Sequence, residues 1–338
     1  MRSSRRARLA GAGLAAILVF TACGSGEPPG QQRADEPPPV CPLTGLKPAR
    51  GTVPDRPALA VKVENLPEVR PQTGLSFADI IYEEPVEGGI TRFIVIYQCR
   101  DATRIQPIRS ARISDVDVLA QYGRPLFAFA GGVKAVFDRV DRSDLVNINY
   151  NVREAADAYH RDPNKSAPHN LYSSTRELYG VAKEEKGAPN PIFNYSPDPP
   201  TTGRRVGTLH IPFSGFSDVY WRWDQASNAY LRSHGDTPHT YSDGNQVAAT
   251  NVVVQVVKVV QSNIIDAAGN PSPEVVSIGS GRAYILRGGR MSAGTWRRPT
   301  VGDVTKFYNR NGDEISLLPG ITWVELVPSE IDISATRQ

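Results

Sequence analysis

The chain has 338 residues, only three cysteines and a formal net charge of +3. Four arginines lie within the first 22 residues, so the remainder carries a net charge of about −1. A nearly neutral chain lacks the basic surface of nucleic-acid-binding proteins, and we therefore expect no nucleic-acid partner.

The first 22 residues have the pattern of an export signal. Four arginines precede an apolar run from Leu9 to Phe20, and Cys23 follows after two further residues. A basic start and a short apolar segment are typical of a secretory signal peptide. The run has about a dozen residues, fewer than the roughly 20 that a membrane-spanning helix needs. We predict a signal peptide over 1–22 and a lipid, including palmitate, on Cys23. The alternative is an ordinary signal peptide with an incidental cysteine.

Lipidation would place the protein on the outer face of the bacterial cytoplasmic membrane, with the lipid as its membrane partner. In that oxidising compartment Cys41 and Cys99 form an even pair. A disulfide between them would close a loop worth about 4 kcal/mol. Two free buried thiols are the alternative. No second pair of ligands lies at zinc spacing around them, and we expect no metal and no cofactor.

Composition divides the rest of the chain. Residues 23–40 are rich in Pro, Gly, Glu and Gln, which favours a disordered tether. About 300 residues follow, a length typical of two domains. Five prolines between Pro189 and Pro200 mark the boundary. We predict an N-terminal domain over 41–190, a linker over 191–206 and a C-terminal domain over 207–330.

The N-terminal domain is expected to mix strands and helices. Runs of strand length lie at Ala58–Val63, Ile80–Tyr82, Arg92–Tyr97 and Leu126–Ala130. Helical patterns lie at Val118–Tyr122, Val133–Val140 and Ser174–Lys186, and Ser114 is the expected cap of the first. Strands that alternate with helices predict an α/β-type domain.

The C-terminal domain is expected to be mostly β, which makes the whole chain α+β. Strand-like runs lie at Val219–Trp223, Asn251–Val260, Val275–Ile278, Ala283–Leu286 and Ile321–Val327. Asn311 followed by Gly312 predicts a hairpin turn.

Several long motifs carry a family resemblance. They include Arg70–Glu83, Val86–Phe93, Ile108–Arg112, Ala167–Tyr172 and Pro319–Trp323. Together these motifs resemble the YerB-like bacterial lipoproteins, a two-domain family of unknown function. The resemblance runs from about Pro42 to Pro328. It implies an envelope location and an architecture, but no reaction. One departure is Gln106 before Pro107, where the family pattern has Gly.

Three arginines form the best candidate ligand site. Arg109 and Arg112 lie three residues apart, just before a predicted helix, and Arg92 precedes them. Guanidinium groups bind carboxylates or phosphates through paired donors. We expect an anionic ligand here, such as a peptidoglycan fragment or another wall polymer. The alternative is internal pairing, with Glu83, Glu87 or Asp117.

A second candidate site is enzymatic. In a continuous strand Glu83 and Glu87 would lie about 13 Å apart, farther than the roughly 5–9.5 Å of a glycosidase pair. A bend at Pro85 could bring them together. His169 lies in a polar loop, where it could act as a general acid or base, with Asn170 orienting a ligand. The alternatives are a solvated acidic turn and a structural histidine.

Two weaker patterns lie in the second half. His234, Asp236 and His239 are ligand types that suit zinc, although Gly235 and Pro238 favour a turn. Trp221 and Trp223 would share one face of a strand, either in the core or as a sugar-stacking platform.

The recognisable enzyme signatures are missing from the sequence, including the nucleophile elbow, the zinc-protease helix and the phosphate loop. Whether the protein is an enzyme therefore stays open. Three functions remain: a binder of an anionic wall ligand through Arg92, Arg109, Arg112 and Asn170; a peptidoglycan hydrolase or lyase that uses Glu83 or Glu87 with His169; and an assembly scaffold.

Overall fold

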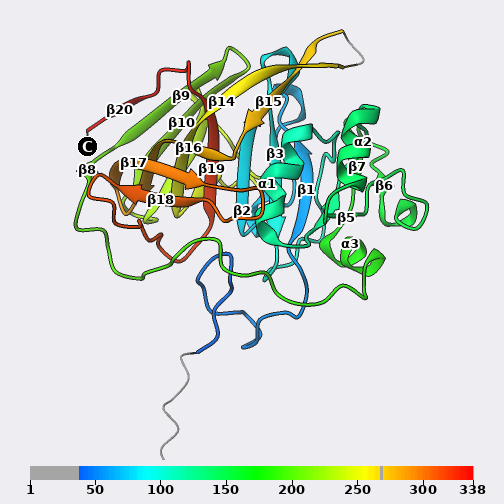
Figure 1. The fold of residues 1–338 in the computed structure, drawn as a ribbon, viewed down its shortest axis with the longest axis horizontal. Coiled ribbons are helices and arrows are strands. Elements are labelled where there is room, and N and C mark those ends of the chain that lie inside the picture. The colour runs from blue at the N-terminus through cyan, green and yellow to red at the C-terminus, as the bar shows by residue number, and fades with distance from the viewer. Residues whose placement is uncertain (1–37, 267–268, 338) are drawn as a thin grey trace, which may run out of the picture. The chain divides into compact units, whose positions relative to one another are not determined.

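The computed structural model describes residues 38–266 and 269–337 (Figure 1). The predicted signal peptide, the lipid site Cys23 and the tether up to residue 37 lie outside the described residues. Within the described part, no helix combines the length and the apolarity that crossing a bilayer would require.

The fold is mostly β, and its largest sheet has 12 strands. The strand order is β18-β17-β16-β14-β19-β2-β3-β1-β4-β5, while β15 pairs with β14 and β8 with β17. Their bounds are β1 Leu59–Glu64, β2 Ile80–Pro85, β3 Thr91–Tyr97, β4 Leu126–Ala128, β5 Val146–Asn147, β8 Arg204–Arg205, β14 Asn251–Ile265, β15 Pro271–Val276, β16 Gly279–Arg287, β17 Arg290–Arg298, β18 Lys306–Asn309 and β19 Thr322–Pro328.

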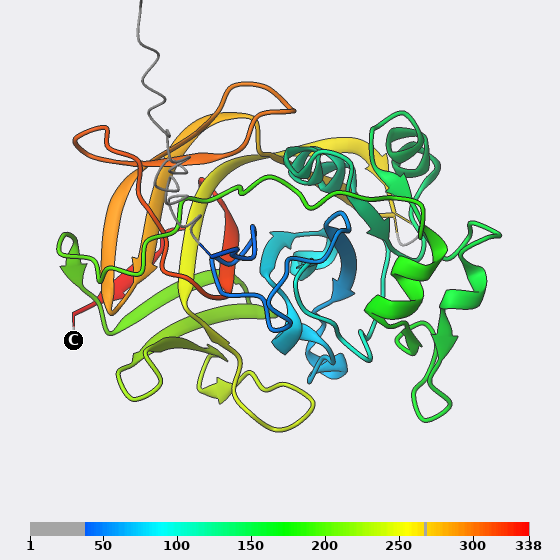
Figure 2. The same ribbon diagram turned by 90° about the horizontal axis from the view of Figure 1, so that it is seen from below.

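Both halves of the chain contribute to this sheet. β19, from the end of the chain, runs parallel to β14 on one side and to β2 on the other. Residue Thr322 is opposite Ile80, and Glu325 is opposite Glu83. Figures 1 and 2 accordingly show the red and yellow strands beside the cyan ones. In the predicted linker, Ile192 and Phe193 are buried in the core.

The three α-helices of the described residues all lie in the first half, beside β1 to β5 (Figure 1). They are α1 Ile113–Leu119, α2 Lys134–Asp141 and α3 Thr175–Val181. A two-stranded ribbon, β6 His160–Arg161 and β7 Leu171–Tyr172, lies with them. Single 3-10 turns occur at Pro67–Val69, Leu75–Phe77, Glu87–Gly89, Ala120–Tyr122 and Ala156–Ala158.

One predicted cap is wrong. Arg112, not Ser114, precedes α1, and the Asp115 carboxylate accepts a hydrogen bond from the Arg112 backbone N–H at 2.6 Å. The Ser114 hydroxyl instead donates to Glu84 at 3.1 Å. For α3 the Ser174 hydroxyl accepts from the Glu177 backbone N–H, but the helix ends at Val181.

A six-stranded antiparallel sheet packs on one face of the large sheet. Its order is β12-β11-β10-β9-β20, with β13 paired to β11. The bounds are β9 Thr208–Ser214, β10 Ser217–Asp224, β11 Ala229–His234, β12 Thr237–Pro238, β13 Ala248–Ala249 and β20 Ser334–Thr336. Trp221 is fully buried with its ring 5.2 Å from that of Trp323, which makes it a core residue.

The large sheet separates two cores. Along β1, Leu59, Val61 and Val63 face the core beneath the small sheet, while Ala60 faces the core beneath α1 and α2. A strand covered on both faces has a continuous apolar sequence. This explains the unbroken runs from which β1 and β3 are predicted.

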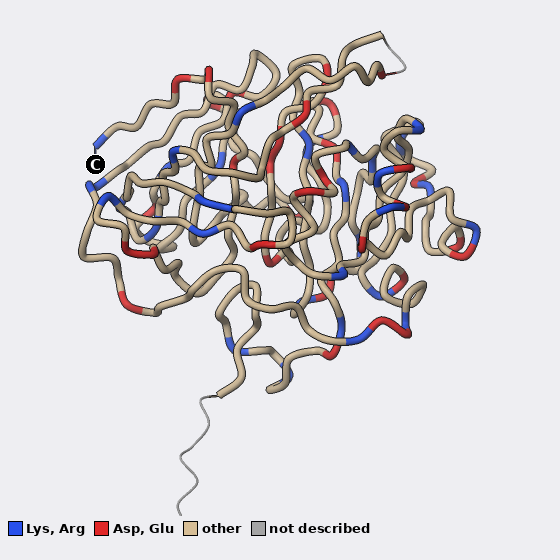
Figure 3. Tube along the Cα trace, in the orientation of Figure 1, with Lys and Arg blue, Asp and Glu red and all other residues tan. Residues whose placement is uncertain are grey.

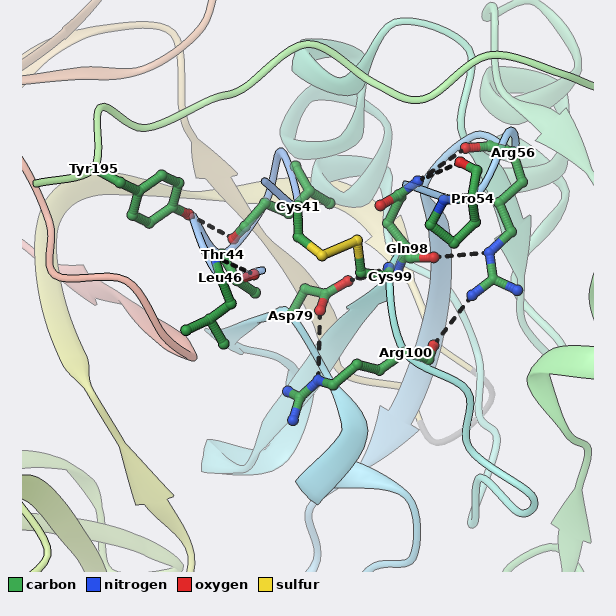
Figure 4. The surroundings of a disulfide bond; sticks show 11 residues. Cys41, Thr44, Leu46, Pro54, Arg56, Asp79, Gln98, Cys99, Arg100 and Tyr195 are labelled. Carbon is green, nitrogen blue, oxygen red and sulfur yellow. Dashed lines mark hydrogen bonds and ion pairs between the residues drawn. A yellow bond between two sulfur atoms is a disulfide. The ribbon is translucent and has the colours of Figure 1, made fainter. Parts of the chain in front are cut away.

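The predicted disulfide between Cys41 and Cys99 is present in the structure (Figure 4). It ties the first described loop to the end of β3. Beside it, Asp79 accepts hydrogen bonds from the backbone N–H groups of Gln98 and Cys99 at 2.6 and 3.1 Å. Burial raises the pKa of Asp79 to about 6, although the Arg100 charge opposes the shift.

Candidate functional site

The three predicted arginines line one pocket of about 320 Å³. Arg92 comes from β3, while Arg109 and Arg112 come from the segment before α1. The opposite wall comes from the β14–β15 hairpin of the second half, through Ile264, Asp266 and Ser272, and from the start of α2, through Gly132, Val133 and Val136. We call this site the arginine pocket.

Arg92 is the least satisfied of the three. Its residue is only 6% exposed, and Nη1 donates to the Ser110 carbonyl at 3.1 Å. Its Nε has no hydrogen-bond partner among the described residues. Burial, together with the charges of Arg112 and Arg109, lowers the pKa of Arg92 to about 9, and the opposing charges of Glu87 and Glu64 do not offset this shift. The surroundings therefore destabilise a charged group that an anion would stabilise.

Arg112 is held by Glu87. Its Nε lies 2.8 Å from Glu87 Oε2, and Nη2 contacts the same oxygen. Burial alone would raise the pKa of Glu87, but Arg112 and the Ser272 hydroxyl hold that pKa below its ordinary value. This contact is the internal pairing that the sequence left as an alternative. Asp117, also considered, pairs with Arg139.

Arg109 pairs with Glu64, which the sequence reading missed. Its Nε lies 3.0 Å from Glu64 Oε1, and His169 Nδ1 lies 2.8 Å from Glu64 Oε2. The Glu64 side chain has no exposed surface. His169 therefore supports the carboxylate behind Arg109 and does not line the pocket. The signal in the sequence that could have identified Glu64 is an acidic residue at the end of an apolar strand.

Asn170 lies outside the arginine pocket. Its Oδ1 accepts a hydrogen bond from Arg161 at 2.8 Å, and its Nδ2 donates to the Asp162 carbonyl at 3.4 Å. The structure thus brings together three of the four predicted ligand-binding residues. Asn170 instead fixes the loop between β6 and β7.

Glu83 and Glu87 belong to separate networks. Glu83 is fully buried, 2.5 Å from Arg232 and 2.6 Å from the Thr91 hydroxyl. β2 ends at Pro85, and Glu87 follows in a 3-10 turn beside Arg112. Among the described residues, no hydrogen bond or ion pair joins the two carboxyl groups to each other or to His169.

Arg232 gathers a second buried network. Its Nη1 donates to His234 Nε2 at 2.6 Å and to His239 Nδ1 at 2.7 Å. Burial and the Arg232 charge lower the pKa of both histidines, so both stay neutral. Asp236 lies toward Arg222 instead, at 3.9 Å. Within 38–266 and 269–337, no cluster of three His, Cys, Asp or Glu side chains has metal-binding geometry.

A third buried network lies next to the arginine pocket. Lys62 Nζ lies 2.6 Å from Asp115 and also contacts Glu84, and none of the three side chains is exposed. Burial raises the pKa of Glu84 to about 7, with the Lys62 charge opposing this shift and Asp115 contributing to it. The only signal for this cluster was one lysine within an apolar strand.

Comparison with known proteins places the fold. Two family models, described as the N-terminal and C-terminal domains of a protein of unknown function (DUF3048), match residues 43–188 and 209–324. The chain is 28% identical to "Putative lipoprotein YerB" of Bacillus subtilis over 297 residues, covering 85% of this chain and 86% of YerB. The crystal structure of Bacillus subtilis YerB superposes with a TM-score of 0.73 at 25% identity, covering 87% of this chain and 99% of that one.

Proposed function

The chain belongs to the DUF3048 family and is homologous to YerB, and from that premise we propose that it is a lipid-anchored envelope protein that binds an anionic ligand in the arginine pocket. The name of the Bacillus relative supports the lipoprotein part, together with the arrangement of residues before Cys23. The anchor would hold the protein on the outer face of the cytoplasmic membrane, within reach of the cell wall.

The observation that carries the binding proposal is the unpartnered Nε of Arg92. A buried donor without an acceptor costs free energy, and more so when it is charged. A carboxylate or phosphate in the pocket would accept from this Nε and add a negative charge beside three guanidinium groups. Glu87 and Glu64 are already engaged with Arg112 and Arg109, so neither supplies that acceptor.

The size of the pocket limits the ligand. A volume of about 320 Å³ lies at the lower end of small-molecule sites. It suits one anionic group with its immediate neighbours, such as the carboxylate end of a peptidoglycan peptide. A longer wall polymer would enter with one end only.

Replacing Arg92 by Met tests this proposal. The soluble chain 38–338 would be titrated calorimetrically with soluble muropeptides. Loss of a charge-assisted contact worth about 1.5–3 kcal/mol should weaken binding by roughly 10- to 150-fold. Stability to urea should stay the same or rise, because removal of a buried, poorly paired charge is often neutral or stabilising.

Arg142→Met, an exposed site beyond α2, is the matched control and should bind as the parent does. If Arg92→Met binds unchanged, the arginine pocket is not the site. If it instead loses stability, Arg92 is a structural residue and the proposal is also wrong.

The hydrolase or lyase alternative is weaker on chemical grounds. A general acid must keep a proton near the sugar, whereas Glu83 and Glu87 are each engaged by an arginine. To test the hydrolase or lyase alternative, the chain 38–338 would be incubated with intact peptidoglycan and the supernatant analysed by mass spectrometry. We expect no new soluble fragments; fragments that disappear in a Glu83→Gln, Glu87→Gln variant shown by circular dichroism to remain folded would establish an enzyme. Capture of an envelope protein without any wall affinity would support the scaffold alternative.

A further inference from the structure

A basic face covers the β18 end of the large sheet, on strands β16, β17 and β18. β16, β17 and β18 are antiparallel neighbours, with Arg282 opposite Thr295 and Thr295 opposite Tyr308. Opposed residues, and residues two positions along each strand, share a face. By this register the face carries Arg282, Tyr284, Thr295, Arg297, Lys306, Tyr308 and, just past the strand, Arg310. We call this set the basic face.

The opposite side of the same strands is the core. Ala283, Ile285, Trp296 and Phe307 alternate with the basic residues and are buried. The basic face therefore points away from the protein. Arg282, Arg297 and Arg310 are exposed, and Figure 3 shows blue segments along β17 and β18.

These arginines are not neutralised by the protein. Among the described residues, Arg282, Arg297 and Arg310 make no ion pair and no side-chain hydrogen bond. Arg297 lies over the Tyr308 ring at 5.4 Å. The acids nearby are Glu314, which pairs with Lys306 at 2.8 Å, and Asp313, which accepts from Asn309 in the turn. A cluster of unpaired like charges attracts anions from solution.

The shape of the face favours an extended ligand. It holds two depressions of about 350 and 380 Å³. They share Ala293, Asn309 and Arg310, so they adjoin, and the first continues to Arg204 of β8. A single small anion would occupy one depression and leave the other arginines unpaired. A linear chain with repeated anionic groups could occupy both.

We propose that the basic face binds a linear polyanion that carries phosphate groups along its backbone. Guanidinium forks match phosphate oxygens in pairs, and the tyrosine rings provide surfaces for the polyol or sugar units between phosphates. A membrane fits less well, because only one of the six exposed large apolar side chains of the described residues, Val301 in the β17–β18 loop, belongs to this part of the sheet. This site is separate from the arginine pocket, so it does not depend on the function proposed above.

The probe is a fluorescently labelled poly(glycerol phosphate), and the readout is its anisotropy with the chain 38–338 over a range of salt concentrations. The test variant replaces Arg282, Arg297 and Arg310 by Gln. All three are exposed and unpaired, so the fold should be unaffected. The matched control replaces Arg142, Arg153 and Lys165 by Gln, which removes the same charge from exposed positions of the first half.

We expect the test variant to bind at least tenfold more weakly, by order of magnitude. The slope of log Kd against log salt concentration should fall by about two, because fewer phosphate contacts form and fewer counterions are released on binding. The control and Arg92→Met should bind as the parent does. Equal loss in the control would overturn the proposal in favour of net charge alone. Tighter binding to phosphatidylglycerol vesicles than to the polymer, lost in the test variant, would assign the face to a membrane instead. Competition by inorganic phosphate at the same phosphate concentration would reduce it to a site for isolated ions.

Discussion

At the scale of single residues, the buried charges differ in how they are compensated. Glu83 accepts from Arg232, Thr91 and Asn65. Glu325, directly opposite on β19, accepts only from the Trp221 indole N–H at 2.7 Å, and its Oε2 has no partner among the described residues. Burial raises the pKa of Glu325 well above its ordinary value, and the nearby Glu83 charge raises it further. Glu325 is therefore the member of the pair that favours the protonated form.

This assignment predicts a large destabilisation for one of two matched substitutions and a small effect for the other. Glu83→Gln should destabilise the protein by about 3–5 kcal/mol, because Arg232 would lose its buried partner. Glu325→Gln should change stability by no more than about 1 kcal/mol, because a neutral amide keeps the acceptor for Trp221. Urea unfolding of both variants measures the difference. Similar losses in the two variants would contradict the assignment.

The raised pKa of Glu325 also makes the stability of the protein depend on pH. A raised folded-state pKa means that the folded protein binds the proton more tightly than the unfolded chain does. The stability that this gives is complete at low pH and is lost as pH rises through the raised pKa of Glu325. Between about pH 6 and about pH 9 the parent should therefore lose more stability than Glu325→Gln.

Residue types alone predicted only part of the site. Arg92, Arg109 and Arg112 could be grouped because guanidinium groups share one ligand chemistry and two of them lie three residues apart. Glu64, Arg232 and Glu325 could not, because each acquires its role from a side chain distant in sequence. The same holds for Lys62, whose partners Glu84 and Asp115 lie 22 and 53 residues away along the chain.

At the scale of elements, long strands were the easiest to predict. β1, β3 and β19 are buried along their whole length and β14 along its first seven residues, and burial on both faces leaves unbroken apolar runs. The cap of α1 was missed because the Ser114 hydroxyl is used by Glu84, from a different strand. A sequence pattern can indicate a local helix cap, but it does not show that a residue distant in sequence binds the same side chain.

The approach of β18 to β17 gives an element-scale prediction. A Cβ on Gly294 would lie 1.8 Å from the Tyr308 carbonyl oxygen, so the two strands would have to separate. Gly294→Ala should destabilise the protein by about 1–3 kcal/mol or more. Gly180→Ala in α3 is the matched control, since nothing lies within 4 Å of the added Cβ. It should be neutral or stabilising by about 0.5–1 kcal/mol. Thermal unfolding separates the two, and an unaffected Gly294→Ala variant would mean that β18 is not held in this register.

At the scale of the whole molecule, the composition of the chain predicts a division into two halves but not which strands of the two halves pair. The proline-rich stretch near residue 200 is visible in the sequence, and one family model ends before it, at residue 188, while the other begins after it, at residue 209. The pairing of β2 with β19 is not visible, because it joins strands more than 200 residues apart, and both are buried, mostly apolar runs. Such pairs carry no sequence pattern that specifies the partner.

That pairing predicts that the two halves unfold together. Residues 38–338 form one compact unit, the large sheet runs through both halves, and the Glu83–Arg232 ion pair joins them in a buried site. All four tryptophans lie in the second half and all three described α-helices in the first. Tryptophan fluorescence and helical circular dichroism should therefore show coincident urea transitions. The fragment 38–206 alone should not fold stably, since β2 would lose β19 and expose a long apolar edge. Two separated transitions, or a stable fragment with native helix content, would show that each half carries a sufficient core of its own.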